Sequence, residues 1–274
     1  MIGQSSIRDI FIDMANNDVF PRFTLLIGPK GSGKTTLAKE IGALVTESKE
    51  NVLELPDVKI DSIREMIKNA YVFTNPTVYI ISDADEMSMA AKNSLLKICE
   101  EPPASTYIIM TLTSKNNTLE TITSRAQTFI MQPYTKNELE EYMCSLTDSC
   151  NGDLILELSE TPGDVRYLLS VGVDDFYEYT EKVVDNIAEV SGANAFKIAE
   201  KISLKTDADG YNLEMFFRIF QHICLQRMHD TDEKDRYLNG ITITNHNLLN
   251  LNVKGVNRQF VIDSWILEIR RAWM

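Results

Sequence analysis

The chain has 274 residues, of which 44% are apolar and 24% are charged, a composition typical of a globular protein. Its net charge of −13 excludes a protein that holds nucleic acid on a broad basic surface, so any DNA contact should be local or shared with partners. No apolar stretch reaches the roughly 18 residues of a membrane span. The first residues lack a basic-then-apolar signal pattern, so we expect a cytoplasmic protein with no membrane partner.

The first half of the chain alternates apolar, β-branched runs with stretches of helical spacing. Such alternation predicts an α/β fold, in which a parallel sheet is covered by helices on both faces. The expected helices and strands are, in order, helix 5–17, strand 24–27, helix 35–46, strand 51–55, a helix opening at Asp61 or Ser62, strand 77–81, helix 89–100, strand 107–112, short helix 118–125 and strand 128–131.

From residue 135 onward the strand signals fade and amphipathic helical patterns replace them. The expected helices are 137–143, 154–160, 164–171, 176–190, 193–202, 211–228 and 259–273. The segment 239–257 is rich in Asn and Thr, and its pattern leaves a short hairpin and irregular structure both open. We predict three domains: a P-loop nucleotide-binding domain over 1–134, a small helical lid over 135–172 and an all-helical domain over 173–274.

One motif dominates the first domain. Between an apolar strand and a helix, the sequence fills the phosphate-loop pattern G-x-x-x-x-G-K-[ST]. Glycines let backbone N–H groups approach phosphate oxygens, and the start of a helix favours negative charge. In this pattern the lysine reaches the β and γ phosphates and the threonine hydroxyl binds Mg²⁺. The predicted ATP-binding residues of the loop are Gly28, Pro29, Lys30, Gly31, Ser32, Gly33, Lys34, Thr35 and, next to it, Thr36.

Three further segments carry a resemblance to a known family. The segment 93–103 reads NSLLKICEEPP, the segment 121–127 reads TITSRAQ, and Gly163-Asp164-Val165-Arg166 follows in the lid. Over about residues 5–170 the chain resembles the AAA+ subunits of sliding-clamp loaders, the bacterial DNA polymerase III delta-prime subunits in particular. The resemblance implies an AAA+ P-loop domain, a helical lid and a collar-like helical domain.

The resemblance also implies roles for residues outside the loop. Arg125 would be an arginine finger given in trans to the nucleotide of a neighbouring subunit, and Arg166 would contact the nucleotide of its own subunit. Thr113, rather than Ser114 or Asn116, would be the first sensor. The alternatives are purely structural. Arg125 could be a surface arginine that caps the carboxyl end of a helix, and Arg166 could be a salt-bridge residue.

The acidic motif departs from the family pattern. Active clamp-loader ATPases place Asp-Glu directly after the buried strand, whereas this chain has Ser82 and Asp83 there. Ser82 lacks the carboxylate that holds Mg²⁺ through its water shell, and Asp83 is shorter than the usual glutamate. Asp83 is the best surviving acid, with Asp85 as a substitute three residues after Ser82. Residues 42–77 contain no cysteine, so the zinc module of several family members is absent.

An intact phosphate loop with a degraded acidic motif predicts an assembly subunit that binds ATP and Mg²⁺ but hydrolyses ATP weakly or not at all. Its expected partners are other clamp-loader subunits in a ring, a sliding clamp, and primer–template DNA reached mainly through the complex. One alternative is a self-sufficient AAA+ ATPase that uses Asp83 or Asp85. Another is a nucleoside or nucleotide kinase, which the absence of an arginine-rich lid disfavours.

Overall fold

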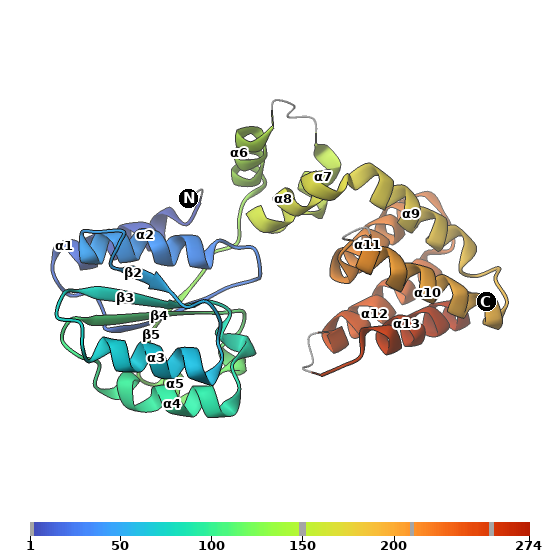
Figure 1. Cartoon of the computed structure of the whole chain (residues 1–274). Coiled ribbons are helices and arrows are strands. Elements are labelled where there is room, and N and C mark those ends of the chain that lie inside the picture. The colour runs from blue at the N-terminus through green and yellow to red at the C-terminus, as the bar shows by residue number, and fades with distance from the viewer. Residues whose placement is uncertain (1–2, 148–151, 209–210, 252–254) are drawn as a thin grey trace. The chain divides into compact units, whose positions relative to one another are not determined.

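The computed structural model describes residues 3–147, 152–208, 211–251 and 255–274. It divides the chain into two units, residues 1–150 with 160–164, and residues 151–159 with 165–274. The first unit is a sheet with helices on both faces, and the described part of the second unit is helical (Figure 1). The predicted fold class, an α/β domain followed by helices, is confirmed.

A five-stranded sheet in the order β2-β3-β4-β1-β5 forms the centre of the first unit. All of its strand pairs are parallel, so the carboxyl ends of the strands lie at the same end of the sheet. In the central register, Leu25 lies between Met110 and Thr128. The strands are β1 (Phe23–Ile27), β2 (Val52–Glu54), β3 (Thr77–Ile81), β4 (Thr106–Leu112) and β5 (Gln127–Ile130).

Helices α1 and α2 cover one face of this sheet, and α3, α4 and α5 cover the other (Figure 1). The helices of the unit are α1 (Ser5–Asn16), α2 (Lys34–Thr46), α3 (Ile60–Ala70), η1 (Ala84–Glu86), α4 (Met89–Glu100), η2 (Lys115–Asn117), α5 (Glu120–Thr123) and α6 (Lys136–Leu146). Successive side chains of a strand point to opposite faces, so Leu25 packs in one core and Leu26 in the other.

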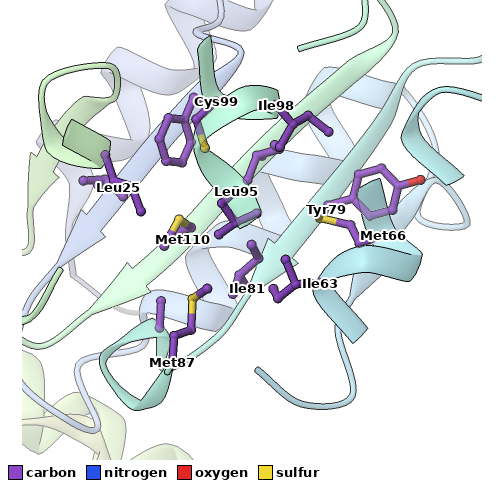
Figure 2. Close-up of a cluster of buried hydrophobic side chains, with 14 of the residues drawn as sticks. Leu25, Ile63, Met66, Tyr79, Ile81, Met87, Leu95, Ile98, Cys99 and Met110 are labelled. Atoms are coloured by element: carbon purple, nitrogen blue, oxygen red, sulfur yellow. The ribbon is translucent and has the colours of Figure 1, made fainter. Parts of the chain in front are cut away.

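Every side chain of β1 and β3 is buried, as expected for strands covered on both faces. Figure 2 shows the larger core, where Ile81 and Met110 meet Ile63 and Leu95 from the covering helices. This packing fixes the strand ends, and the loops that follow those ends are held in place by it.

The second unit is a set of packed helices around Trp265, a fully buried side chain. The rings of Phe216, Phe217 and Phe220 lie within 5.6 Å of the Trp265 ring, centre to centre. The helices are α7 (Asp153–Leu158), α8 (Pro162–Val171), α9 (Val173–Asn186), α10 (Gly192–Ala208), α11 (Leu213–Asp230), α12 (Lys234–Leu251) and α13 (Arg258–Trp273). Within the described residues, none of these or the earlier helices is long and apolar enough to cross a membrane.

Helix α12 settles most of the segment 239–257 that the sequence left between hairpin and irregular structure. Residues 252–254 lie outside the described residues. Thr244 on α12 is buried and accepts a hydrogen bond of 2.9 Å from the Trp265 indole nitrogen. Gly240 lies against Trp273, where a Cβ would come within 2.8 Å of the ring. Both contacts tie α12 to α13.

Candidate nucleotide-binding site

The phosphate loop leaves the carboxyl end of β1 and enters α2 at Lys34. Gly31 and Gly33 have φ of 79° and 82°, a left-handed conformation that favours glycine. A Cβ on Gly28 would lie 2.7 Å from the Met131 side chain, so this position also requires glycine. The loop therefore has the strand–loop–helix form that the motif needs to wrap its amides around phosphate.

Lys34 is buried and its ammonium group is held by the loop itself. Nζ donates to the carbonyl oxygens of Gly28 and Pro29 at 2.9 and 2.8 Å. Burial lowers the pKa of Lys34, while the nearby charges of Asp83 and Asp85 act to raise it. The ammonium is thus placed at the mouth of the loop, bonded to acceptors that a phosphate oxygen can replace.

The other predicted loop residues take distinct positions. Pro29 and Lys30 are exposed at the crest of the loop, and Thr36 is exposed on the first turn of α2. Ser32 is buried, and its hydroxyl donates to the Pro29 carbonyl at 2.8 Å. These residues, with Lys34 and Thr35, lie in the phosphate loop and the first turn of α2.

Thr35 faces the end of β3, where the family pattern has its aspartate. Its Oγ1 lies 3.0 Å from Oγ of Ser82, and the Ser82 hydroxyl donates to Oε1 of Glu54 at 2.7 Å. A carboxylate is therefore present beside the site, although it comes from β2 and not from β3. Glu54 was not singled out from the sequence, since only the strand order brings its strand next to β3.

Asp83 and Asp85 differ in what their neighbours do. Asp83 has a φ of 51°, and its backbone N–H donates to Oγ1 of Thr111 at 3.0 Å. The Asp85 carboxylate accepts from the backbone N–H of Thr113 at 2.8 Å, from its hydroxyl at 3.0 Å and from the Asn117 amide at 2.9 Å. Asp85 therefore fixes Thr113, the predicted first sensor, at the end of β4.

Of the two alternatives for the first sensor, Ser114 caps the short helix η2. Its Oγ accepts from the backbone N–H of Asn116 at 3.3 Å. Thr113 directly follows β4 at the carboxyl end of the strands, the same end of the sheet as the phosphate loop. The choice of Thr113 stays a prediction.

Segments from later in the chain close over the phosphate loop. The hydroxyl of Tyr134 donates to the Ser32 carbonyl at 2.8 Å. The backbone N–H of Gly163 donates to the Gly31 carbonyl at 3.0 Å, and a Cβ on Gly163 would lie 2.5 Å from the Gly31 Cα. This close approach of two backbones explains a glycine at position 163 without any reference to a ligand.

Arg125 lies at the amino ends of the strands, at the end of the sheet opposite the phosphate loop. It follows α5 and precedes β5, close to Arg22 and Phe23 at the start of β1, and these residues line one surface pocket. Its guanidinium donates to the Thr121 carbonyl and to Glu100, each at 2.6 Å. Because the phosphate loop leaves the carboxyl end of β1, Arg125 lies at the opposite end of this strand from the loop.

Arg166 lies on α8 within the second unit, which begins again at Val165 after the boundary at Asp164. Its predicted contact with the nucleotide of its own chain stays a prediction.

The residues at the loop fit a nucleotide with Mg²⁺. Glycines open the backbone, Lys34 supplies a buried cation, and Thr35 supplies a hydroxyl of the kind that Mg²⁺ takes together with phosphate oxygens and waters. In the described part of the chain, no group of three or more His, Cys, Asp and Glu side chains is placed to hold a metal. A metal here would depend on the nucleotide for most of its ligands.

The parallel sheet, the phosphate loop and the helical region that follows have the fold of AAA+ P-loop proteins. Solved structures agree with this fold. A DNA polymerase III gamma subunit-related protein of Thermotoga maritima superposes with a TM-score of 0.57 at 14% identity, covering 96% of this chain and 99% of that one. The RuvB Holliday junction branch migration motor of Thermotoga maritima gives 0.52 at 18% identity, covering 97% and 87%.

Sequence comparison finds similarity to DNA polymerase III subunits. Residues 45–135 match the family described as "DNA polymerase III, delta subunit". The gamma/tau subunit of Mycoplasma genitalium is 26% identical over 73% of this chain and 38% of its own length. The delta' subunit of Bacillus subtilis is 34% identical over 32% of this chain and 27% of its own length. These matches confirm the resemblance to DNA polymerase III clamp-loader subunits, although the chain spans well under half the length of these relatives.

Proposed function

We propose that this chain is an AAA+ subunit of a DNA polymerase III-like clamp loader that binds ATP at its own phosphate loop and gives Arg125 to the nucleotide site of a neighbouring subunit. One observation carries the proposal. The phosphate loop lies at the carboxyl ends of the strands of the parallel sheet, and Arg125 lies at their amino ends. A subunit built in this way can hold a nucleotide at one end of the sheet and complete a neighbour's site with the other end.

The nucleotide would be held by backbone N–H groups of the loop, of which Pro29 has none, by the Lys34 ammonium and by Thr36. Thr35 would bind Mg²⁺. Thr113 and Arg166 would complete the site as the first and second sensors. Bound Mg²⁺ would neutralise phosphate charge, and the chain's own part is to bind and orient the nucleotide.

Hydrolysis by this chain should be weak or absent. Ser82 replaces the usual carboxylate at the end of β3, and the Asp85 carboxylate is already engaged by Thr113 and Asn117. Asp83 is the remaining candidate to orient the attacking water, and its side chain is one methylene shorter than that of the usual glutamate. Phosphoryl transfer depends on positioning and charge, so each of these changes slows it.

The guanidinium of Arg125 is at the surface and is held by Glu100 in an ion pair of 2.6 Å. An arginine placed against the developing charge of a transferring phosphate accelerates hydrolysis by about 10³–10⁵ in other nucleotidases. In the assembled ring, the neighbour's γ-phosphate would replace Glu100 as the partner of Arg125.

The partners follow from the same proposal. Other clamp-loader subunits would form a ring with this chain through the helices of residues 173–274, after the AAA+ domain of 1–134 and the lid of 135–172. The ring would load a sliding clamp at primer–template DNA in the cytoplasm. The net charge of −13 favours DNA contact through the complex, not through this chain alone.

The test uses the purified full chain. ATP binding is measured by calorimetry and turnover by phosphate release, with Lys34→Ala as the control that removes the loop cation. The proposal predicts binding that Lys34→Ala abolishes and turnover no faster than in that variant. Robust turnover by the isolated chain would instead show a self-sufficient ATPase that uses Asp83 or Asp85, and absence of ATP binding would refute the proposed site.

A further inference from the structure

A line of hydrogen bonds leads from the metal-binding position of the phosphate loop to the edge of the sheet. Oγ1 of Thr35 lies 3.0 Å from Oγ of Ser82, and the Ser82 hydroxyl donates to Oε1 of Glu54 at 2.7 Å. The three side chains come from α2, the end of β3 and the end of β2. The sheet order makes this possible, since β2 pairs with β3 in a register that sets Glu54 opposite Ile80.

The direction of these bonds follows from counting protons. Each hydroxyl has a single hydrogen, and the hydrogen of Ser82 points to the Glu54 carboxylate, which can only accept. The bond between the two hydroxyls must therefore be donated by Thr35. The lone pairs of the Thr35 oxygen are left for another partner, which is the state that a hydroxyl needs in order to bind a cation.

Glu54 is kept ionised and in place by a cation on the same helix as Thr35. Oε2 of Glu54 and Nζ of Lys39 are 2.6 Å apart, and Lys39 lies one helical turn after Thr35. Burial alone would raise the pKa of Glu54, but hydrogen bonds from Lys39 and Ser82 outweigh burial and lower that pKa below its ordinary value. An acceptor at the end of the line is therefore present at neutral pH.

We propose that Glu54, acting through Ser82, takes over the positioning role of the carboxylate that is missing at the end of β3. In this role Glu54 is a positioning residue that orients the Thr35 hydroxyl toward Mg²⁺ and adds negative charge beside it. The inference rests on the proposed binding of an Mg²⁺-nucleotide. It goes further by giving Glu54 of β2, a residue outside the phosphate-loop pattern, a role in metal binding.

The test compares nucleotide affinity with and without the metal. Calorimetry with ATP is run in Mg²⁺ and in EDTA on the full chain, on Glu54→Leu, and on the matched control Glu65→Leu at an exposed position of α3. Groups that orient metal ligands typically change metal affinity by about 10- to 100-fold. We expect Glu54→Leu to weaken ATP binding by about tenfold or more in Mg²⁺ only, and Glu65→Leu to leave both affinities unchanged.

Two further variants keep the test independent of how Glu54→Leu folds. Ser82→Ala breaks the line in the middle and should lose the same Mg²⁺-dependent affinity, with no further loss when combined with Glu54→Leu, because the two act as one unit. Ser82→Asp supplies a carboxylate directly to Thr35 and should make affinity insensitive to Glu54→Leu. Thermal unfolding of each variant checks that it is folded.

The outcomes separate the role of Glu54 from the proposed nucleotide-binding site. If the full chain binds ATP more tightly in Mg²⁺ and Glu54→Leu behaves like Glu65→Leu, the role of Glu54 is wrong and the nucleotide site stands. If Glu54→Leu weakens binding equally in EDTA, Glu54 only supports the loop and its role toward the metal is refuted. If the full chain binds no ATP under either condition, the proposed function fails as well.

Discussion

The contact between Gly163 and Gly31 allows a prediction from backbone geometry alone. In Gly163→Ala, the new Cβ would lie 2.5 Å from the Gly31 Cα and 3.1 Å from the Gly31 carbonyl oxygen. Both are backbone atoms of the phosphate loop and cannot rotate away. Either the loop or the start of α8 must move, and the hydrogen bond of 3.0 Å between the two glycines is then lost.

The expected size follows from three contributions. Inserting a methyl group into a packed contact costs about 1–3 kcal/mol, and loss of the hydrogen bond costs about 1 kcal/mol. Gly163 is the second residue of α8, so alanine regains at most about 1 kcal/mol of helix propensity. The net destabilisation is about 1–3 kcal/mol, which corresponds to a fall in Tm of about 2–5 °C in a chain of this size.

The assay is thermal unfolding of the full chain, followed by circular dichroism. The control is Gly192→Ala, because a Cβ on Gly192 meets no atom within 4 Å and Gly192 begins α10. The control should keep or slightly raise Tm, and Gly163→Ala should lower it. Hydrogen exchange of the loop amides should also be faster in Gly163→Ala. Equal stability of the two variants would refute the close backbone contact at the phosphate loop.

Three other predictions concern the two cores and one carboxylate. Trp265→Ala should destabilise the second unit by about 3–5 kcal/mol in urea unfolding, whereas the exposed Leu249→Ala should change little; a small effect of Trp265→Ala would contradict its central place in the core. Burial raises the pKa of the Cys99 and Cys224 thiols to about 12; both should resist alkylation at mildly alkaline pH until the chain is unfolded, as read by mass spectrometry. The pKa of Glu54 lies below its ordinary 4.5, so its stabilising effect is complete above pH 4.5 and is lost as the pH falls through the lowered value. Glu54→Leu should therefore flatten the acid limb of stability against pH, and an unchanged limb would show that this carboxylate has no favourable native partner.

Much of the fold could be predicted because its signals are local. The run TVYII gave strand 77–81 with its observed bounds, since five buried, mostly β-branched residues suit a strand covered on both faces. The helix 89–100 was likewise predicted with its observed bounds. Its start is fixed by Ser88, whose side chain accepts from the Ala91 N–H, and its end by the two prolines that follow.

Helix α12 could not be predicted, because its sequence opposes its structure. The run ITITNHNLLN, residues 241–250, is rich in β-branched residues and asparagine, which have modest helix propensity. Packing overrides propensity here: Thr244 is held by the Trp265 indole, and Gly240 gives room to Trp273. Both tryptophans are on α13, so the deciding contacts are distant in sequence.

The site shows the same division between local and distant information. The phosphate loop was readable because its residues are contiguous and each has a mechanical reason to be there. Glu54 was not readable, because it is the last residue of a three-residue strand and meets Ser82 only through the pairing of β2 with β3. That Asp85 holds Thr113 likewise depends on the pairing of strands, which no spacing in the sequence indicates.

The central claim is that this chain holds one nucleotide and completes the site of another. The measurement that tests it most directly is phosphate release by a ring assembled from co-purified partner subunits and this chain, with Arg125→Ala compared to the exposed control Arg64→Ala. The Arg125 ion pair is at the surface and worth about 0–1 kcal/mol, so the variant should stay folded and bind ATP at its own loop as before. We predict that Arg125→Ala slows hydrolysis at the neighbour's site by about 10³-fold or more, so that phosphate release by the ring falls by that site's share, and that Arg64→Ala leaves phosphate release unchanged. Unchanged hydrolysis with Arg125→Ala would contradict the account.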